Sequence, residues 1–383
     1  MRLTFIHDHK FIYKDDMYYS SGKFSKSIME RYLVGPIDNI QFICRQETNI
    51  NTTENLSNVS SNNIVINPIK FLKSKADFII KRKKIYQFLK ENIHPEDIVI
   101  IRMPSEIGYI AASYLKNKNV PYGIELVGDP WDSLWYHGSV IGKMMAFINK
   151  YKVKKYVKHS NNTIYVTKHY LQKRYPSKNN TYNASNVLIN KVENNYKTNK
   201  SSYKKVGLIG SLDTKYKGID TALRSMTILN ENIKLEIVGN GPQEIWNKKI
   251  RKLNLSNRVT LKGTLKSGKE IENWFSTLDL YIQPSYTEGL PRALVEAMSN
   301  GLPCLGSDVG GIPELLPSTY IHHAKDYKKL AKHISLVISN ESLSNEMSQQ
   351  NLITANNYLS SNIQREREKF IKTICREKAE YES

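Results

Sequence analysis

The chain has 383 residues, with 56 Lys or Arg against 36 Asp or Glu, a formal net charge of +20. This length exceeds the size at which one hydrophobic core keeps growing, so we expect two domains. The charge predicts attraction to polyanions, which include nucleic acids, anionic membranes and phosphorylated substrates. Three widely separated cysteines argue against a disulfide framework and against a cysteine zinc site.

The N-terminal residues turn polar directly after Phe5 and Ile6, which predicts a first strand in place of a signal peptide. No apolar run approaches the roughly 20 residues that a membrane-spanning helix needs. We therefore expect the protein in the cytoplasm. The basic charge leaves open that it works at the inner face of the cytoplasmic membrane.

Short apolar runs alternate with helical patterns in the first half of the chain. These runs lie at residues 3–6, 40–44, 64–66, 98–101, 122–127 and 163–166. Such alternation predicts a parallel sheet wrapped by helices. The asparagine-rich stretch 49–63 is interpreted as a surface loop. A loop containing Gly22 and Lys23 precedes a helical pattern that starts at Ser25.

Residues 143–158 interleave lysine with aromatic and aliphatic side chains at spacings that fit one helix. Two interpretations remain open at this point. The helix could lie on an anionic bilayer. It could instead pack its apolar side into its own domain and leave the lysines in water, which is the interpretation that the pattern favours. A second basic cluster, residues 81–84, could add to the same surface.

The stretch 190–203 is rich in Asn, Lys and Ser, and it precedes a new series of strands. We expect strands at 206–209, 235–238, 259–261, 280–283 and 303–305, and helices from residue 326 onward. The predicted domains are therefore 1–195 and 196–355, followed by a helical tail, 356–383. Both domains are expected to be doubly wound α/β units, with ligands at the carboxyl ends of their strands and a cleft between them.

The most informative stretch is 285–296, which reads as a strand end, a glycine turn and a helix start. Pro291 is favoured at the first position of a helix, and backbone N–H groups collect near Gly289 and Leu290. Together with the helix dipole, these groups predict a phosphate site. Glu288 and Glu296 cannot bind phosphate, so they are expected to accept hydrogen bonds from sugar or ribose hydroxyls.

The spacing of Glu288 and Glu296 resembles the E-x7-E motif of retaining glycosyltransferases of family 4, and residues 297–304 and 308–314 continue the likeness. The resemblance implies a GT-B fold whose C-terminal tail crosses back to the first domain. It also implies transfer of a sugar, with retention, from a nucleoside-diphosphate sugar to a glycan or lipid-linked glycan acceptor in polysaccharide biosynthesis. The basic helix could bring such an enzyme to an anionic membrane.

The resemblance assigns roles on the donor side. Lys217, followed by Gly218, matches the family lysine that faces the diphosphate, and Lys215 is the alternative. Glu288 would hold the donor sugar and Glu296 the ribose. Ser211 stands where the family often has an arginine, so one cation is missing or supplied elsewhere. The other implied donor-binding residues are Gly210, Gly239, Gly241, Lys262, Gly263, Ser285, Gly289, Leu290 and Pro291.

On the acceptor side, the resemblance points to Gly22, Lys23 and Trp131. Many family members have a histidine after the strand that here ends in Gly128 and Asp129. Asp129 could replace that histidine near the reacting sugar, or it could only open the turn before a proline.

The sequence contains no motif of the kind that binds catalytic metal, so no metal or other cofactor is implied. Three other functions stay open. A GT-B sugar-nucleotide epimerase would bind the same donor. A nucleic-acid-binding protein is suggested by charge alone, because no recognition motif accompanies it and no nucleic-acid partner is expected. The departures at Ser211 and Asp129 also allow a glycosyltransferase-like subunit without activity.

Overall fold

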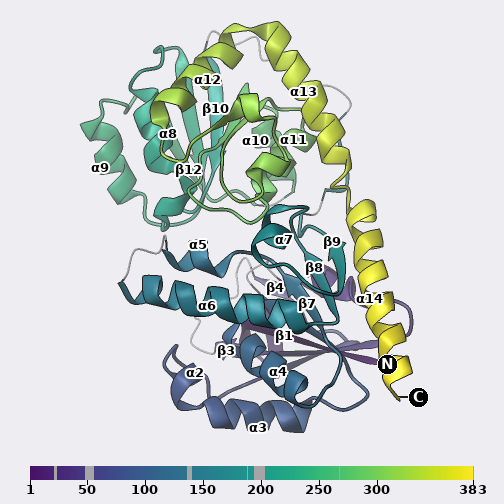
Figure 1. The fold of residues 1–383 in the computed structure, drawn as a ribbon. Helices are drawn as coiled ribbons and strands as arrows, with labels where there is room; N and C mark the ends of the chain where they lie inside the picture. The colour runs from purple at the N-terminus through teal and green to yellow at the C-terminus, as the bar shows by residue number, and fades with distance from the viewer. Residues whose placement is uncertain are drawn as a thin grey trace.

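The computed structural model describes residues 1–20, 24–47, 56–135, 140–187, 189–193, 203–266 and 268–382, which form two α/β halves stacked on each other (Figure 1). The first sheet has the order β4-β2-β1-β6-β7-β8-β9, and β3 and β5 continue it from β1. Its strands are β1 (Arg2–Lys14), β2 (Met17–Ser20), β3 (Asn39–Glu47), β4 (Ser57–Asn58), β5 (Ile64–Pro68), β6 (Ile98–Met103), β7 (Gly123–Leu126), β8 (Asn162–Tyr165) and β9 (Asn180–Asn183).

All strands expected in the first half are present, and the long β1 is parallel to both β3 and β6. The antiparallel strands β2 and β4 and the edge strand β9 were not predicted, because they lack a run of apolar residues. Part of the expected loop at 49–63, residues 49–55, lies outside the described residues.

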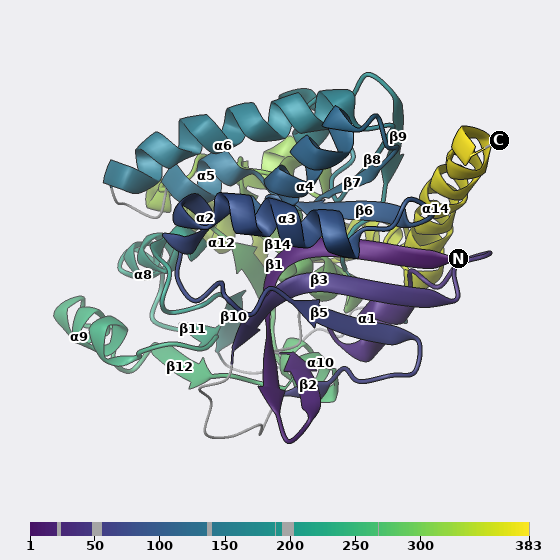
Figure 2. The same cartoon turned by 90° about the horizontal axis from the view of Figure 1, so that it is seen from below.

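Both faces of the first sheet are covered by helices (Figure 2). Ile98 and Ile100 of β6 belong to the buried cluster that includes Phe370 of the C-terminal helix, whereas Val99 and Ile101 belong to the cluster on the opposite face. A strand that is buried on both sides needs apolar residues at every position, which explains the continuous run in β6. The helices of this half are α1 (Lys26–Glu30), α2 (Asp77–Ile80), α3 (Arg82–Asn92), α4 (Glu106–Asn117), α5 (Pro130–Trp135), α6 (Val140–His159) and α7 (Tyr170–Arg174).

The second sheet is parallel, in the order β12-β11-β10-β13-β14-β15. Its strands are β10 (Lys204–Ile209), β11 (Ile233–Val238), β12 (Val259–Gly263), β13 (Leu280–Gln283), β14 (Cys304–Ser307) and β15 (Ile321–His322). Its helices are α8 (Ile219–Met226), α9 (Glu244–Lys252), α10 (Lys269–Phe275), α11 (Arg292–Ser299), α12 (Tyr327–Ser339) and α13 (Glu341–Asn356). The prediction of two doubly wound units is confirmed.

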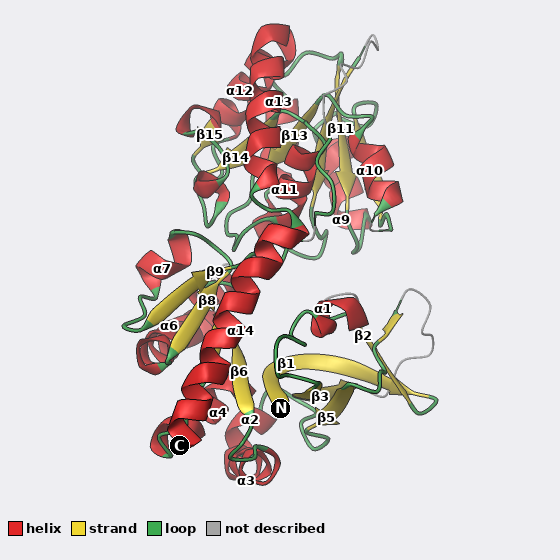
Figure 3. Ribbon diagram, turned by 90° about the vertical axis from the view of Figure 1, so that its right-hand side faces the viewer, coloured by secondary structure: helices red, strands yellow, loops and turns green. Residues whose placement is uncertain are grey.

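The C-terminal helix α14 (Ser360–Glu382) leaves the second half and runs beside β8 and β9 of the first (Figures 1 and 3). Its contacts there include a hydrogen bond from the Tyr182 hydroxyl to Thr373, at 2.8 Å, and the packing of Phe370 and Ile374 against Gly123. The implied crossing back of the tail is therefore confirmed. The domain limits stay a prediction, because the boundary at 195–196 lies outside the described residues.

The favoured interpretation of the basic helix is wrong for its first half. In α6, Val153 and Val157 are buried, but Ile141, Met144 and Phe147 are exposed. Among the described residues, no helix is both long enough and apolar enough to cross a membrane.

Candidate active site

A cavity of about 530 Å³ lies between the two halves. Its walls come from the ends of several strands and from the loops that follow them, as expected for doubly wound sheets. The lining residues from the first half are His7, Phe24, Ile28, Arg31, Arg102, Pro104, Val127, Gly128, Asp129, Val166, Ser185 and Asn186. Those from the second half are Tyr216, Lys217, Thr287, Glu288, Gly289, Leu290 and Arg292.

Glu288 and Lys217 meet at this cavity. The Lys217 ammonium lies 2.6 Å from Oε1 of Glu288, and their side chains are only 22% and 9% exposed, respectively. Ser285 Oγ and Gln283 Nε2 also donate to Oε1, at 2.7 and 3.0 Å. Since three donors converge on one oxygen, the carboxylate is held in one orientation at the end of β13.

The backbone conformation of Gly218, the residue after Lys217, lets the Lys217 loop approach the loop that carries Glu288. Gly218 has a φ of +74°, and a Cβ there would lie 1.8 Å from the carbonyl oxygen of Pro284. Only glycine accepts both the left-handed conformation and this approach. A backbone hydrogen bond of 2.7 Å from Tyr286 N to Tyr216 O joins the two loops.

The turn before α11 differs from the prediction by one residue. Helix α11 begins at Arg292, and Pro291 occupies the N-cap position. Within the described residues, the amides of Gly289 and Leu290 have no hydrogen-bond partner, and both residues line the cavity. Gly289 lies against the other half, because a Cβ there would be 3.1 Å from the carbonyl oxygen of Val127.

The predicted glycines just after β10 and β11 and at the end of β12 lie close together at the carboxyl ends of these strands. Gly239 N donates to Gly263 O at 2.8 Å, and a Cβ on Gly239 would lie 2.0 Å from Gly210 O. Gly241 has a φ of +115° and adjoins Asp213. These glycines allow close approach of the loops to each other, and none of them is among the residues that line the cavity.

Ser211 brings no positive charge to the site. Among the described residues, its hydroxyl contacts Asp213, at 3.4 Å, and the Asn240 carbonyl, at 3.5 Å. Lys215 and Lys262 are exposed and are not among the residues that line the cavity. Of Lys217 and Lys215, the two lysines considered for the diphosphate, it is Lys217 that lines the cavity.

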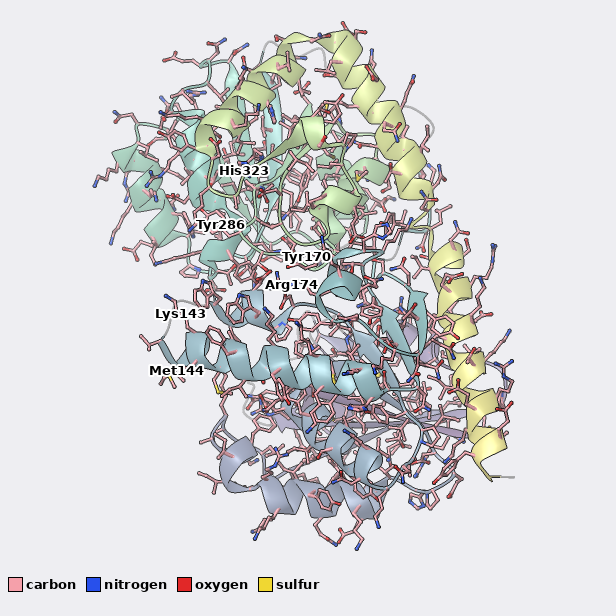
Figure 4. The ribbon with its side chains drawn as sticks, viewed as in Figure 1. Lys143, Met144, Tyr170, Arg174, Tyr286 and His323 are labelled. Carbon is pink, nitrogen blue, oxygen red and sulfur yellow. The ribbon has the colours of Figure 1, made fainter. Side chains whose placement is uncertain are left out.

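Asp129 lines the cavity, but its carboxylate is occupied. Arg174 Nε lies 2.6 Å from Oδ2, and Tyr175 OH and Trp131 N donate to Oδ1, at 2.5 and 2.8 Å. The Trp131 bond opens helix α5 in the manner of an N-cap. Arg174 also pairs with Asp132, and burial raises the pKa of that second carboxyl. Arg174 and Tyr170 lie where the two halves meet (Figure 4).

Sequence reasoning missed two arginines of the first half, Arg31 and Arg102, that line the cavity. Arg102 lies 3.8 Å from buried Glu125 and 4.8 Å from the centre of the Phe24 ring. Arg367 of α14 also pairs with Glu125, at 3.3 Å. Burial, and then repulsion by Arg367, lowers the pKa of Arg31 to about 10. Arg102 and Arg367 are paired with Glu125, and Arg31 interacts with the same carboxylate electrostatically. Three positive charges beside one negative charge leave an excess of positive charge next to the cavity. The sequence offers no signal for this, because the four residues are far apart in the chain.

Glu296 does not line this cavity. It borders a second one, of about 320 Å³, formed by the start of α10, the linker residues near Asn190 and helix α11. Arg292 borders both cavities and lies 3.5 Å from Glu296. The two glutamates therefore face neighbouring spaces, and Arg292 stands between them.

A further contact joins the two halves beside the cavity. The carboxylate of Glu314 accepts hydrogen bonds from the backbone amides of Lys168, His169 and Tyr170, at 2.6, 3.0 and 2.6 Å. The second half thus caps helix α7 of the first half.

Gly22 and Lys23 lie outside the described residues. Trp131 does not line either cavity and packs instead against Trp135 and Phe147. No group of three His, Cys, Asp or Glu suited to holding a metal ion occurs in the described part of the chain.

The model of the family "Glycosyl transferases group 1" matches residues 190–352. Protein CapJ of Staphylococcus aureus is 38% identical over 376 residues, which cover 96% of this chain and 94% of that protein. The amylovoran biosynthesis glycosyltransferase AmsK of Erwinia amylovora is 35% identical over 113 residues, 27% of this chain and 28% of that protein. The chain belongs to the group 1 glycosyltransferases and is a glycosyltransferase.

The fold of the whole chain is similar to that of proteins whose structures have been solved. Anabaena Alr3699/HepE, solved in complex with UDP, superposes with a TM-score of 0.69 at 15% identity, and the match covers 97% of this chain and all of that one. The architecture is therefore GT-B, with two Rossmann-like halves facing each other.

Proposed function

We propose that this protein transfers a sugar, with retention, from a nucleoside-diphosphate sugar to a glycan or lipid-linked glycan acceptor in polysaccharide biosynthesis. One observation carries the proposal. Glu288 and Lys217 lie 2.6 Å apart in a cavity between the halves, beside the amides of Gly289 and Leu290. That arrangement combines a hydroxyl acceptor, a cation and an anion-binding turn.

The charge balance of the cavity supports a diphosphate ligand. Arg31, Arg102, Lys217 and Arg292 are four cations, against the two carboxylates of Asp129 and Glu288. The excess of two positive charges matches the two charges of a diphosphate in the donor. The arginines of the first half would supply the cation that Ser211 does not provide. Fixed cations and amides that face a leaving diphosphate stabilise the charge that develops there.

Glu288 would orient the donor sugar. Its Oε1 is occupied by three donors, so Oε2 is the atom positioned to accept from sugar hydroxyls. Lys217 would move from Glu288 toward the diphosphate when the donor binds, since lysine is a flexible point charge. No nucleophilic carboxylate is assigned. Attack of the acceptor hydroxyl on the face of the departing phosphate would give retention.

Glu296 would bind the ribose in the second cavity, and β12 with the loop after it, including Lys262, would meet the base. The HepE structure holds UDP, which makes uridine donors the first to test. The assignment to polysaccharide biosynthesis and to retaining family 4 is supported by the name of AmsK and by the E-x7-E motif. The proposal needs no metal or cofactor, and places the protein in the cytoplasm, in contact with the anionic inner face of the membrane.

The test is a thermal-shift screen of uridine, guanosine, adenosine and thymidine diphosphates, followed by mass analysis of products from the matching sugar donors in the presence of EDTA. A ligand at 100 times its Kd stabilises the fold by about 2.7 kcal/mol, so binding of one nucleotide raises the Tm. We expect one base to give a clear shift and its donor to yield a transfer product. A donor isomerised without any acceptor would indicate an epimerase instead. The absence of a shift with all four nucleotides would refute the assigned site.

A further inference from the structure

Helix α6 exposes large apolar side chains on the side that faces away from its own domain. The exposed fractions range from 47% to 75%, so these residues are in contact with solvent over much of their surface. At the helical repeat of 3.6 residues they fall within about 120° of the circumference. They are Val140, Ile141, Met144, Phe147, Ile148 and Tyr151.

The opposite side of α6 is buried and, in its first half, made of small or polar residues. The buried residues are Gly142, Ala146, Asn149, Val153, Tyr156 and Val157. Small residues let the helix lie close to the domain without using its large side chains. The exposed apolar stripe is therefore not needed for packing α6 against the fold. A contiguous apolar surface of this kind marks an interaction site.

Two tryptophans extend the stripe onto α5. Trp131 and Trp135 are half-buried and stacked, with ring centres 5.0 Å apart, and Phe147 meets Trp131 edge to face at 4.4 Å. Lys150 lies 4.8 Å from the centre of the Trp131 ring, and Lys143 lies 5.2 Å from that of Trp135. Amphipathic rings with lysines around them suit the boundary between lipid and water.

Lysines border the apolar stripe and replace it toward the end of the helix. Lys143 and Lys150 lie along one flank, and Lys154, Lys155 and Lys158 are exposed along the continuation of the stripe. A helix with Lys on its polar borders and Trp, Phe and aliphatic residues between them fits a surface of anionic lipid. Figure 4 shows Lys143 and Met144 at the outer end of α6, away from the bulk of the fold.

We propose that Trp131, Trp135 and the exposed stripe of α6, together called the α5–α6 surface, dock on an anionic lipid bilayer. The net charge of +20 supplies the long-range attraction, and the apolar stripe supplies the insertion that charge alone cannot give. A nucleic acid would match the charge but would leave the apolar stripe in water, which is why lipid is the better occupant.

The α5–α6 surface lies next to the candidate active site. Helix α5 begins at Pro130, directly after Gly128 and Asp129, which line the cavity. Docking would therefore bring the mouth of the cavity near the bilayer, where a lipid-linked acceptor is held. Docking itself does not require the transfer reaction, whereas this presentation of the acceptor rests on the proposed function.

Helix α2 offers a second apolar contact. Ile79 and Ile80 are 78% and 77% exposed, and the basic residues 81–84 follow directly. In Figures 1 and 2, α2 lies toward the same end of the first half as the start of α6. This adds to the basic and apolar character of that end of the molecule.

The test uses vesicle flotation of the full chain, without donor or acceptor, on vesicles of phosphatidylglycerol and phosphatidylcholine and on vesicles of phosphatidylcholine alone. The variant Ile141→Ser/Met144→Ser/Ile148→Ser removes three exposed side chains without changing charge. We expect it to lower the partition coefficient on the anionic vesicles by at least ~10-fold. Lys143→Gln/Lys150→Gln/Lys154→Gln should also lower it by at least ~10-fold, with little change on neutral vesicles.

The matched control is Ile228→Ser/Ile245→Ser/Ile353→Ser, because these side chains are 57%, 68% and 63% exposed on the second half. It should float like the wild type. Equal flotation of wild type and α6 variant, or equal loss in the control, would overturn the proposal. So would a smaller oligomer for the α6 variant without vesicles, since the stripe would then join copies of this chain. Vesicle binding with no transfer in the nucleotide test would leave docking intact and refute only the transfer reaction of the proposed function.

Discussion

The two sides of the cavity are built in different ways. On the side of the second half, two short loops supply Lys217, Ser285, Glu288 and Gly289, and the family resemblance of their motifs already implied that they share one site. On the side of the first half, charge is organised by contacts between distant segments, such as Arg367 with Glu125. The comparison shows that local motifs specify the wall of the cavity from the second half, whereas the wall from the first half depends on the fold and can diverge without leaving a motif.

The largest effect is expected from substitutions in the wall of the cavity that belongs to the second half. Lys217→Met and Glu288→Gln should each lower kcat by roughly 100-fold to 1,000-fold, as removal of one preorganised charge-stabilising group does. The two residues share one contact, so the double variant should lose much less than the product of the single losses. Initial rates with the identified donor measure this.

The exposed carboxylate of Glu244, 77% exposed on α9, provides the matched control. Glu244→Gln should retain wild-type kcat. If the effects of Lys217→Met and Glu288→Gln simply multiplied, the two side chains would act on separate steps, and the shared site described above would be wrong.

A substitution in the wall of the cavity from the first half should lower the stability of the fold more than it lowers the rate of transfer. Asp129 is 1% exposed and satisfies Arg174 and Tyr175, so Asp129→Asn breaks a buried ion pair and should lower the free energy of unfolding by about 3 kcal/mol. Activity per folded molecule should fall far less than in Glu288→Gln. Urea denaturation and initial rates separate the two effects.

Asp38→Asn is the control for this prediction, because that carboxylate is 68% exposed and pairs only with the N-terminus and nearby groups. It should change stability by no more than about 0.5 kcal/mol. A stable Asp129→Asn protein without transfer activity would show that Asp129 contacts the reacting sugar in place of the family histidine.

A smaller effect is expected on the pH dependence of stability, and it comes from the second half alone. Burial, and then His333, lowers the pKa of His322 in the second sheet to about 4. The folded state therefore binds this proton less readily than the unfolded chain, whose His pKa is about 6.5. The stabilisation is complete above pH 6.5 and is lost as the pH falls toward 4. Between pH 7 and pH 5 it should amount to about 2 kcal/mol.

His322→Gln should remove this part of the pH dependence of unfolding, measured by urea denaturation at pH 7, 6 and 5. His169→Gln changes an exposed histidine of the first half and should leave the slope unaltered. An unchanged slope in His322→Gln would mean that His322 gains a proton in the folded state as easily as in the unfolded chain.

The sequence by itself determined the alternation of strands and helices and the two halves, whereas the crossing tail and the place of Lys217 at the site were implied by the family resemblance. The alternation follows from apolar runs and glycine turns, which act within a few residues, and the resemblance depends mainly on the E-x7-E spacing. The strands β2, β4, β9 and β15 escaped prediction because they are short and few of their residues are apolar, so pairing with neighbouring strands decides their conformation.

Only the tertiary structure decided which partners Asp129 and the arginines near the cavity have, and which face of the basic helix is buried. Asp129 is taken up by Arg174, which is 45 positions later in the chain, and Arg367 reaches Glu125 from the C-terminal helix. Helix α6 could have buried either side, and close packing of Gly142 and Ala146 against the domain turned its large apolar residues outward. Burial is a property of the assembled fold, so a periodic pattern can indicate a helix while leaving open which of its faces is covered.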